Sequence, residues 1–186
     1  MRTLARVISG GQTGVDQAAL WAARDCGLAI GGWCPPGRGC DSGVIPLEFP
    51  LQETEHERSP DAPDVPRSQR TEWNVRDSDA TLVIRSGKAS HSDAATEEAA
   101  TEEEPDLGTD WAVQCAARYE RPLQVCDVGD PNAKEKIQQW LAGLPIRTLN
   151  VAGPGESTAP GIGRRAYELL RRVFEESDKR REGNGR

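Results

Sequence analysis

A glycine-rich turn near the amino terminus constrains the fold of this chain more than any other feature. Leu4–Ile8 is short and largely apolar, as expected for a strand, and Ser9–Asp16 follows it with three glycines. Apolar residues then recur at helical spacing from Val15 to Cys26. Such a turn points unpaired N–H groups at one spot, where the helix dipole also favours an anion. The stretch predicts either a phosphate- or carboxylate-binding turn or an ordinary turn that needs glycine only for its geometry.

The turn departs from the common nucleotide-binding motifs. Ser9 stands where the dinucleotide fingerprint G-x-G-x-x-G has its first glycine, and Val15 stands where a Walker A loop requires lysine. A conventional NAD enzyme has a ribose-binding acid about 20 residues after the glycines. Trp33 and Cys34 occupy that place, which disfavours such an enzyme.

Strand and helix patterns alternate along the rest of the chain. The predicted strands after the first are 28–34, 80–84, 122–128 and 148–152, and the predicted helices are 15–26, 70–76, 109–119, 133–144 and 162–174. This alternation predicts an α/β fold with a Rossmann-like, doubly wound and mostly parallel sheet of five or more strands, in three α/β/α layers. We expect a single domain over residues 1–177.

Three segments interrupt the pattern. Residues 35–43 are rich in proline and glycine and are predicted to form a loop rather than a helix, and 44–69 are predicted to form a long surface loop. Residues 87–107 are mainly Ala, Thr, Ser and Glu, so we expect an acidic, mobile insertion. Residues 178–186 are charged and are expected to form a frayed tail.

Three small-residue turns each precede a predicted helix: Gly10–Gly14, Gly108–Thr109 and Gly153–Ser157. In parallel α/β sheets, ligands bind beyond the carboxyl ends of the strands. The three turns are therefore expected to meet in one anion-binding crevice, with hydroxyls from Thr13, Thr109 and Ser157. Because most donors would be amides, no single basic residue is expected to be indispensable.

Bulk properties exclude several function classes. The net charge of −7 argues against a general nucleic-acid or anionic-membrane binder, and no apolar run approaches the roughly 20 residues that span a bilayer. Five cysteines, an odd number, suit a reducing cytosol, so we expect a cytoplasmic protein. His56 and His91 lack metal-ligand spacing, and no structural metal is expected. Cys34 is interpreted as a solvent-facing loop cysteine, the alternative being a soft metal ligand.

Four stretches together resemble the molybdenum-cofactor carrier family, a cpYpsA-related group of the SLOG and lysine-decarboxylase-like Rossmann superfamily. They are Ile8–Asp16, Arg70–Val75, Ser78–Val83 and Leu149–Ser157. The resemblance implies binding of molybdenum cofactor (molybdopterin) or another nucleotide- or phosphate-bearing ligand, and assembly into a homo-oligomer, a dimer or tetramer. By position, the residues implied to line the site are Gly10, Gly11, Gln12, Thr13, Gly14, Thr71, Asn74, Gly108, Thr109, Gly153, Glu156 and Ser157.

The hydrolase branch of that superfamily carries a P-G-G-x-G-T-x-x-E pattern whose glutamate assists glycosidic cleavage. Around Gly108-Thr109 this chain has no acid in the place of that glutamate. The leading interpretation is therefore a carrier with no catalytic residue, whose apolar walls shield a heterocycle. The alternatives are a nucleotide 5'-monophosphate phosphoribohydrolase that uses Glu72 or Glu156, and a sensor of a nucleotide-derived ligand.

Overall fold

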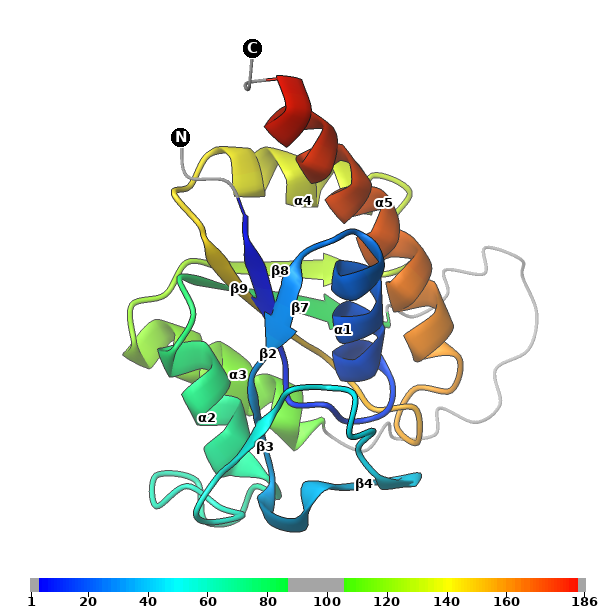
Figure 1. Ribbon diagram of the computed structural model, residues 1–186. Coiled ribbons are helices and arrows are strands. Elements are labelled where there is room, and N and C mark those ends of the chain that lie inside the picture. The colour runs from blue at the N-terminus through cyan, green and yellow to red at the C-terminus, as the bar shows by residue number, and fades with distance from the viewer. Residues whose placement is uncertain (1–3, 87–105, 184–186) are drawn as a thin grey trace, which may run out of the picture.

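A computed structural model of the chain describes residues 4–86 and 106–183. Five strands form one parallel sheet in the order β2-β1-β9-β7-β8. Their bounds are β1 Arg6–Ile8, β2 Ala29–Gly31, β7 Ala80–Arg85, β8 Leu123–Asp127 and β9 Thr148–Ala152. Figure 1 shows this sheet with helices on both of its faces. The fold is Rossmann-like, as predicted.

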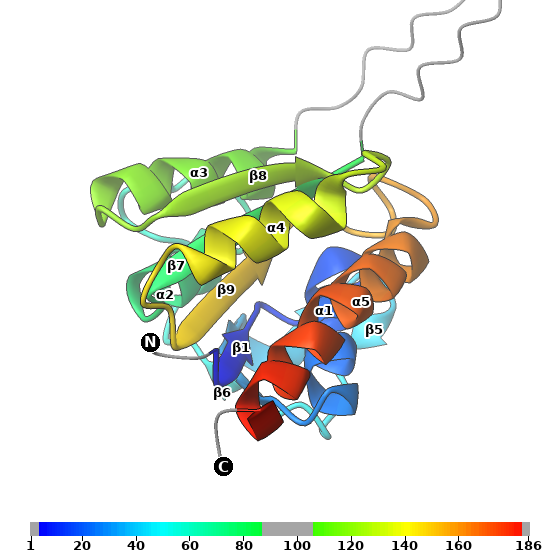
Figure 2. The same cartoon turned by 90° about the horizontal axis from the view of Figure 1, so that it is seen from above.

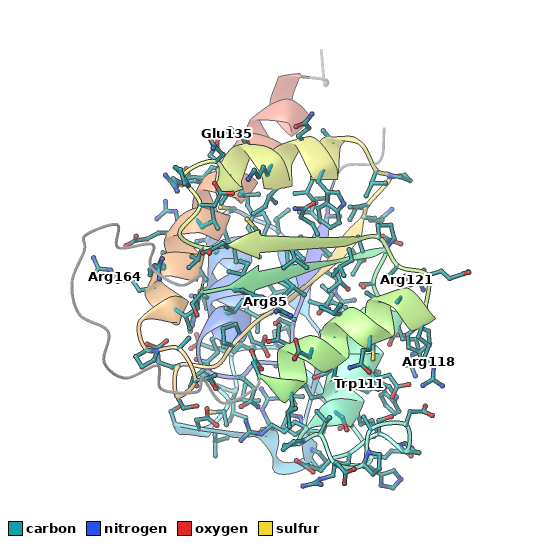
Figure 3. All side chains as sticks on the ribbon, turned by 180° about the vertical axis from the view of Figure 1, so that it is seen from behind. Arg85, Trp111, Arg118, Arg121, Glu135 and Arg164 are labelled. Carbon is teal, nitrogen blue, oxygen red and sulfur yellow. The ribbon has the colours of Figure 1, made fainter. Side chains whose placement is uncertain are left out.

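Two helical layers cover the sheet. One contains α1 (Val15–Asp25), α4 (Ala133–Ala142) and α5 (Ile162–Gly183), and the other contains α2 (Ser68–Arg76) and α3 (Leu107–Arg118). Figure 2 shows α2 and α3 on the opposite side of the sheet from α1 and α5. Each layer has its own apolar cluster, the larger under α1, α4 and α5 and the smaller around Val75, Trp111 and Cys115. In Figure 3, Trp111 of α3 lies close to α2, where its indole N–H donates to the Ser68 carbonyl.

The strand that is clearest in the sequence owes its apolar character to its position. β7 lies between β8 and β9, and all five of its residues from Ala80 to Ile84 are buried. A strand covered on both faces by helices must be apolar on both sides, which removes the usual alternation with polar residues.

The segment between β2 and α2 differs from the prediction. The expected strand over 28–34 breaks at Gly32, whose φ is 129°, and β3 (Trp33–Cys34) leaves the main sheet to pair with β6 (Gln52–Glu53). A short 3-10 turn, η1 (Pro36–Arg38), follows, and β4 (Gly39–Cys40) then forms a hairpin with β5 (Gly43–Val44). The segment 35–43 therefore contains a 3-10 turn and a hairpin but no α-helix, in line with the prediction of a loop rather than a helix.

Residues 44–69 are also more than a surface loop. Ile45, Phe49 and Leu51 are buried in a third apolar cluster with Leu20, Cys34 and Cys40, so the solvent-facing assignment of Cys34 was wrong. Arg38 holds this cluster closed: its guanidinium donates to the carbonyls of Leu51, Pro46 and Phe49 at 3.0–3.1 Å. Apolar residues without regular spacing can thus form a core when one half-buried guanidinium group binds the carbonyls of their segment.

The predicted insertion and the predicted tail both have different boundaries in the structure. α3 begins at Leu107 with Asp106 as its N-cap, so the last residue of the expected insertion lies in a helix and the residue before it caps that helix. The expected mobility of the insertion concerns residues 87–105, which lie outside the described residues. α5 continues to Gly183, past residue 178, where the sequence predicts a frayed tail.

Candidate functional site

The three small-residue turns contribute to one cavity of about 260 Å³ beyond the carboxyl ends of the strands. β1 and β9 are neighbours in the sheet, so the segments that follow them leave the sheet side by side. The amino end of α3 supplies another wall. The lining residues are Gln12, Asp16, Asp41, Pro66, Arg67, Arg70, Thr71, Asp106, Leu107, Gly108, Thr109, Ala152, Gly153, Gly155, Ser157 and Thr158.

Half of the residues implied by the resemblance line this cavity: Gln12, Thr71, Gly108, Thr109, Gly153 and Ser157. The others lie close by and make contacts within the protein. Asn74 bonds both the N–H and the carbonyl of Trp33. Glu156 accepts from the N–H groups of Gly161 and Gly163, at the start of α5. The hydroxyl of Thr13 is buried without a hydrogen-bond partner among the described residues.

The glycines of the first turn admit close neighbours. A Cβ on Gly10 would collide with the guanidinium of Arg70, and one on Gly14 would lie 2.5 Å from the Pro154 carbonyl oxygen. Val15 N–H donates to that same carbonyl. Gly14 therefore lets the turn after β1 pack directly on the turn after β9, while Gly10 makes room for an arginine.

Two arginines that sequence reasoning did not place in the site line the cavity. Arg70, on α2, donates to Asp16 at 2.7 Å, and its side chain is 14% exposed against 2% for Asp16. Burial raises the pKa of the Asp16 carboxyl above its usual range, although Arg70 acts in the opposite direction. The ion pair fixes Arg70 beside the first glycine turn. The sequence contains one signal for these two residues: Arg67 and Arg70, both basic, lie three residues apart where the helix predicted over 70–76 begins, so they share one helix face.

Arg67 belongs to a second polar cluster at the cavity. Its guanidinium donates to Asp41 at 3.2 Å and to the Gln12 side-chain oxygen at 2.7 Å. Ser157 donates its hydroxyl to Asp41 at 2.6 Å. These contacts, Ser157 first and then Arg67, hold the pKa of Asp41 below its usual range. Gln12 also donates to the Gly39 carbonyl, so the cluster joins the first turn, the β4–β5 hairpin and α2.

The amino end of α3 already has an internal partner. Asp106 accepts from the Thr109 N–H at 3.1 Å and from the Thr109 hydroxyl. A ligand that used this helix end would compete with a carboxylate of the protein itself.

The cavity walls are mostly polar. Pro66, Leu107 and Ala152 are the apolar side chains among the lining residues, fewer than the apolar walls expected from the sequence. A neighbouring cavity of about 850 Å³ shares Asp106, Thr109, Ser157 and Thr158 with the first, so the two cavities adjoin at these side chains.

The acids proposed for hydrolysis lie elsewhere. Glu72 is buried between Ser59 and Tyr119 and accepts a hydrogen bond from each, and Glu156 caps α5. Neither lines the cavity. All five cysteines are buried thiols outside it, and within residues 4–86 and 106–183 no group of three or more His, Cys, Asp or Glu is placed to hold a metal ion.

None of the helices in the described part of the chain is long and apolar enough to cross a membrane.

The comparisons with known proteins agree with this architecture. The chain is similar to the crystal structure of a "putative molybdenum carrier protein" from Syntrophus aciditrophicus SB, with 32% sequence identity and a TM-score of 0.74 over 93% of this chain and 96% of that one. A comparison with curated proteins finds no match. Residues 7–174 match the circularly permutated YpsA SLOG family, cpYpsA. The chain belongs to this family.

Proposed function

We propose that this chain is a binding or carrier protein that holds a phosphate-bearing small molecule in the cavity, with molybdenum cofactor as the leading candidate. One observation carries the proposal: two guanidinium groups, those of Arg67 and Arg70, share a cavity with the glycine turn after β9 and the amino end of α3. Guanidinium groups bind phosphate through paired charge-assisted hydrogen bonds. Among the donors that line the cavity, Ser157 is exposed and the Arg67 side chain is 34% exposed, whereas Thr109 is buried.

The donor set fits the phosphate end of a pterin cofactor. A phosphate fits the arginine and hydroxyl donors, and carboxylates such as Asp41 can accept from the N–H groups of a heterocycle. The first cavity alone is small for such a ligand, since pockets for small molecules measure about 300–1,000 Å³, but the adjoining cavity extends it. A metal carried by the cofactor would find no cysteine thiol among the residues that line the cavities.

Replacement of Arg67 tests the proposal. Loss of a hydrogen bond to a charged group costs about 1.5–3 kcal/mol, so Arg67→Gln should weaken the binding of AMP, used as a phosphate-bearing probe, by about 10- to 150-fold. Calorimetric titration measures the effect. Arg118→Gln is the matched control, because Arg118 also pairs with an aspartate, Asp61, and ends α3 away from the cavity (Figure 3).

Two further readouts separate the alternatives. Native mass spectrometry of the protein purified without added ligand identifies a retained cofactor by its mass, and it also tests the predicted homo-oligomer. Release of free adenine from AMP by the wild-type protein would favour a phosphoribohydrolase instead. Equal affinity of Arg67→Gln and the wild type for AMP would contradict the proposed site.

A further inference from the structure

The carboxylate of Asp41 accepts hydrogen bonds from the kinds of donor that bind anionic ligands. Both terminal nitrogens of Arg67 donate to one of its carboxylate oxygens at 3.2 Å, and the Ser157 hydroxyl donates to the other at 2.6 Å. A guanidinium group and a hydroxyl thus supply three donors to the two oxygens of one anionic group, and such charge-assisted hydrogen bonds also bind phosphate. All three side chains line the cavity.

The backbone at Arg67 supports a specific role for this arrangement. Arg67 has φ 56° and ψ 25°, a left-handed conformation at the N-cap of α2, and it is stabilised by a hydrogen bond from its N–H to Glu57. Non-glycine residues adopt this conformation at a cost, and such residues concentrate at binding sites. The strained backbone sets the starting direction of the Arg67 side chain, which reaches Gln12 and Asp41 at the cavity.

Asp41 is the member of the cluster that is able to leave. It lies in the two-residue tip of the β4–β5 hairpin, whose neighbour Cys40 is anchored in the third apolar cluster. The Asp41 side chain is 32% exposed and that of Arg67 34%. Rotation of the Asp41 side chain alone would release the carboxylate to water without movement of the hairpin backbone.

From these observations we propose that Arg67 and Ser157 form the anion-receiving position of the site, and that Asp41 occupies it until the phosphate of a ligand displaces its carboxylate. This inference rests on the proposed binding function and adds an internal competitor to it. Asp41 then lowers affinity and excludes weakly bound anions, because an incoming group must bind Arg67 better than a carboxylate that is always present.

The test is the affinity of Asp41→Asn for inorganic phosphate, measured by calorimetry or ³¹P NMR titration. Asparagine keeps the shape of the side chain but removes its charge, so Arg67 becomes available, and phosphate should bind about two- to fivefold more tightly than in the wild type. Asp77→Asn is the matched control: Asp77 is a similarly exposed aspartate that pairs with Arg76 and accepts from Trp33 outside the cavity. It should leave phosphate affinity unchanged.

A double variant tests whether the increase in phosphate affinity depends on Arg67. If Asp41→Asn acts by freeing Arg67, then Arg67→Gln in the Asp41→Asn background should abolish the tighter binding. Circular dichroism and thermal unfolding show whether the variants are folded, and Asp41→Gly serves as a second variant if Asp41→Asn is not.

The outcomes distinguish the two proposals. Tighter binding by Asp41→Asn that depends on Arg67 supports the competitor role. Unchanged or weaker binding by this variant, with a wild type that binds phosphate, overturns the inference and leaves the proposed function standing. Absence of phosphate and AMP binding in both proteins overturns the proposed function itself.

Discussion

Gly11 and Gly37 share a backbone conformation but differ in their surroundings. Their φ values are +77° and +73°. A Cβ on Gly11 would lie 2.6 Å from Leu51 Cδ1 and 3.0 Å from Ile45 Cγ2, whereas one on Gly37 would meet nothing within 4 Å. Gly11 therefore points into the third apolar cluster and not into the cavity, so its replacement would disturb the fold before it blocked a ligand.

We expect Gly11→Val to lower the free energy of unfolding by about 2–5 kcal/mol, the sum of overpacking and a strained backbone. Gly37→Val has the same strain without the overpacking and should cost only about 1–3 kcal/mol. Urea unfolding of the two variants gives the difference directly. Equal losses would mean that Leu51 and Ile45 move aside easily, and that the cluster is loosely packed.

At the scale of elements, a buried polar network joins α2 to α3. Tyr119, just after α3, donates its hydroxyl to Glu72 of α2 at 2.6 Å, and Glu72 also accepts from Ser59. Burial, together with the bond to Glu72, raises the pKa of Tyr119 to about 12. A raised pKa means that the stabilisation is complete below the unfolded value of about 10 and is lost as pH rises through the folded value. At neutral pH the network is intact.

Removal of the Tyr119 hydroxyl should therefore destabilise the protein at neutral pH. Tyr119→Phe leaves one oxygen of a buried carboxylate without a donor, and we expect a loss of about 1–3 kcal/mol in the free energy of unfolding. Tyr167→Phe is the control, since Tyr167 makes an equivalent bond to Asp25 at the surface and its loss should matter less. A larger effect of Tyr167→Phe in urea unfolding would contradict this ranking.

The sequence predicted best the elements whose buried residues recur at regular spacing or follow one another without interruption. β7 and α1 are examples, because a fully covered strand and an amphipathic helix each leave a local signature. The segment from Trp33 to Arg67 left none. Its core residues Ile45, Phe49 and Leu51 are spaced irregularly, and they are buried because Arg38 and the hairpin fold over them.

The same reasoning explains the incomplete prediction of the site. Glycine turns are visible in a sequence, and three of them line or adjoin the cavity. Arg67 and Arg70 reach it only because the 33–67 segment carries the start of α2 beside the first turn, a long-range placement that spacing does not encode. Because spacing does not reveal this placement, the sequence analysis expected backbone amides to be the main donors and did not include the two guanidinium groups.

At the scale of the whole molecule, the site joins segments that are distant in the sequence. Gln12, Asp41, Arg67 and Ser157 form one hydrogen-bonded cluster, and they come from the turn after β1, the β4–β5 hairpin, the start of α2 and the turn before α5. A mutation in any of these four segments should therefore alter ligand binding in the cavity, whereas a mutation outside them should not. Residues 87–105 belong to none of these four segments.

We expect replacement of 87–105 by about six Gly and Ser residues to leave the melting temperature unchanged or slightly raised. Apart from Pro105, the segment has no apolar side chain larger than alanine to bury, and a shorter connection loses less entropy on folding, about 0.6 kcal/mol for each halving of its length. A second deletion that also removes Asp106 and Leu107 takes away the cap of α3 and should cost about 0.5–2 kcal/mol. Thermal unfolding of both proteins separates the contributions of the segment and the cap. A large loss of stability in the first deletion would show that 87–105 packs against the protein or a second copy of it, in spite of its composition.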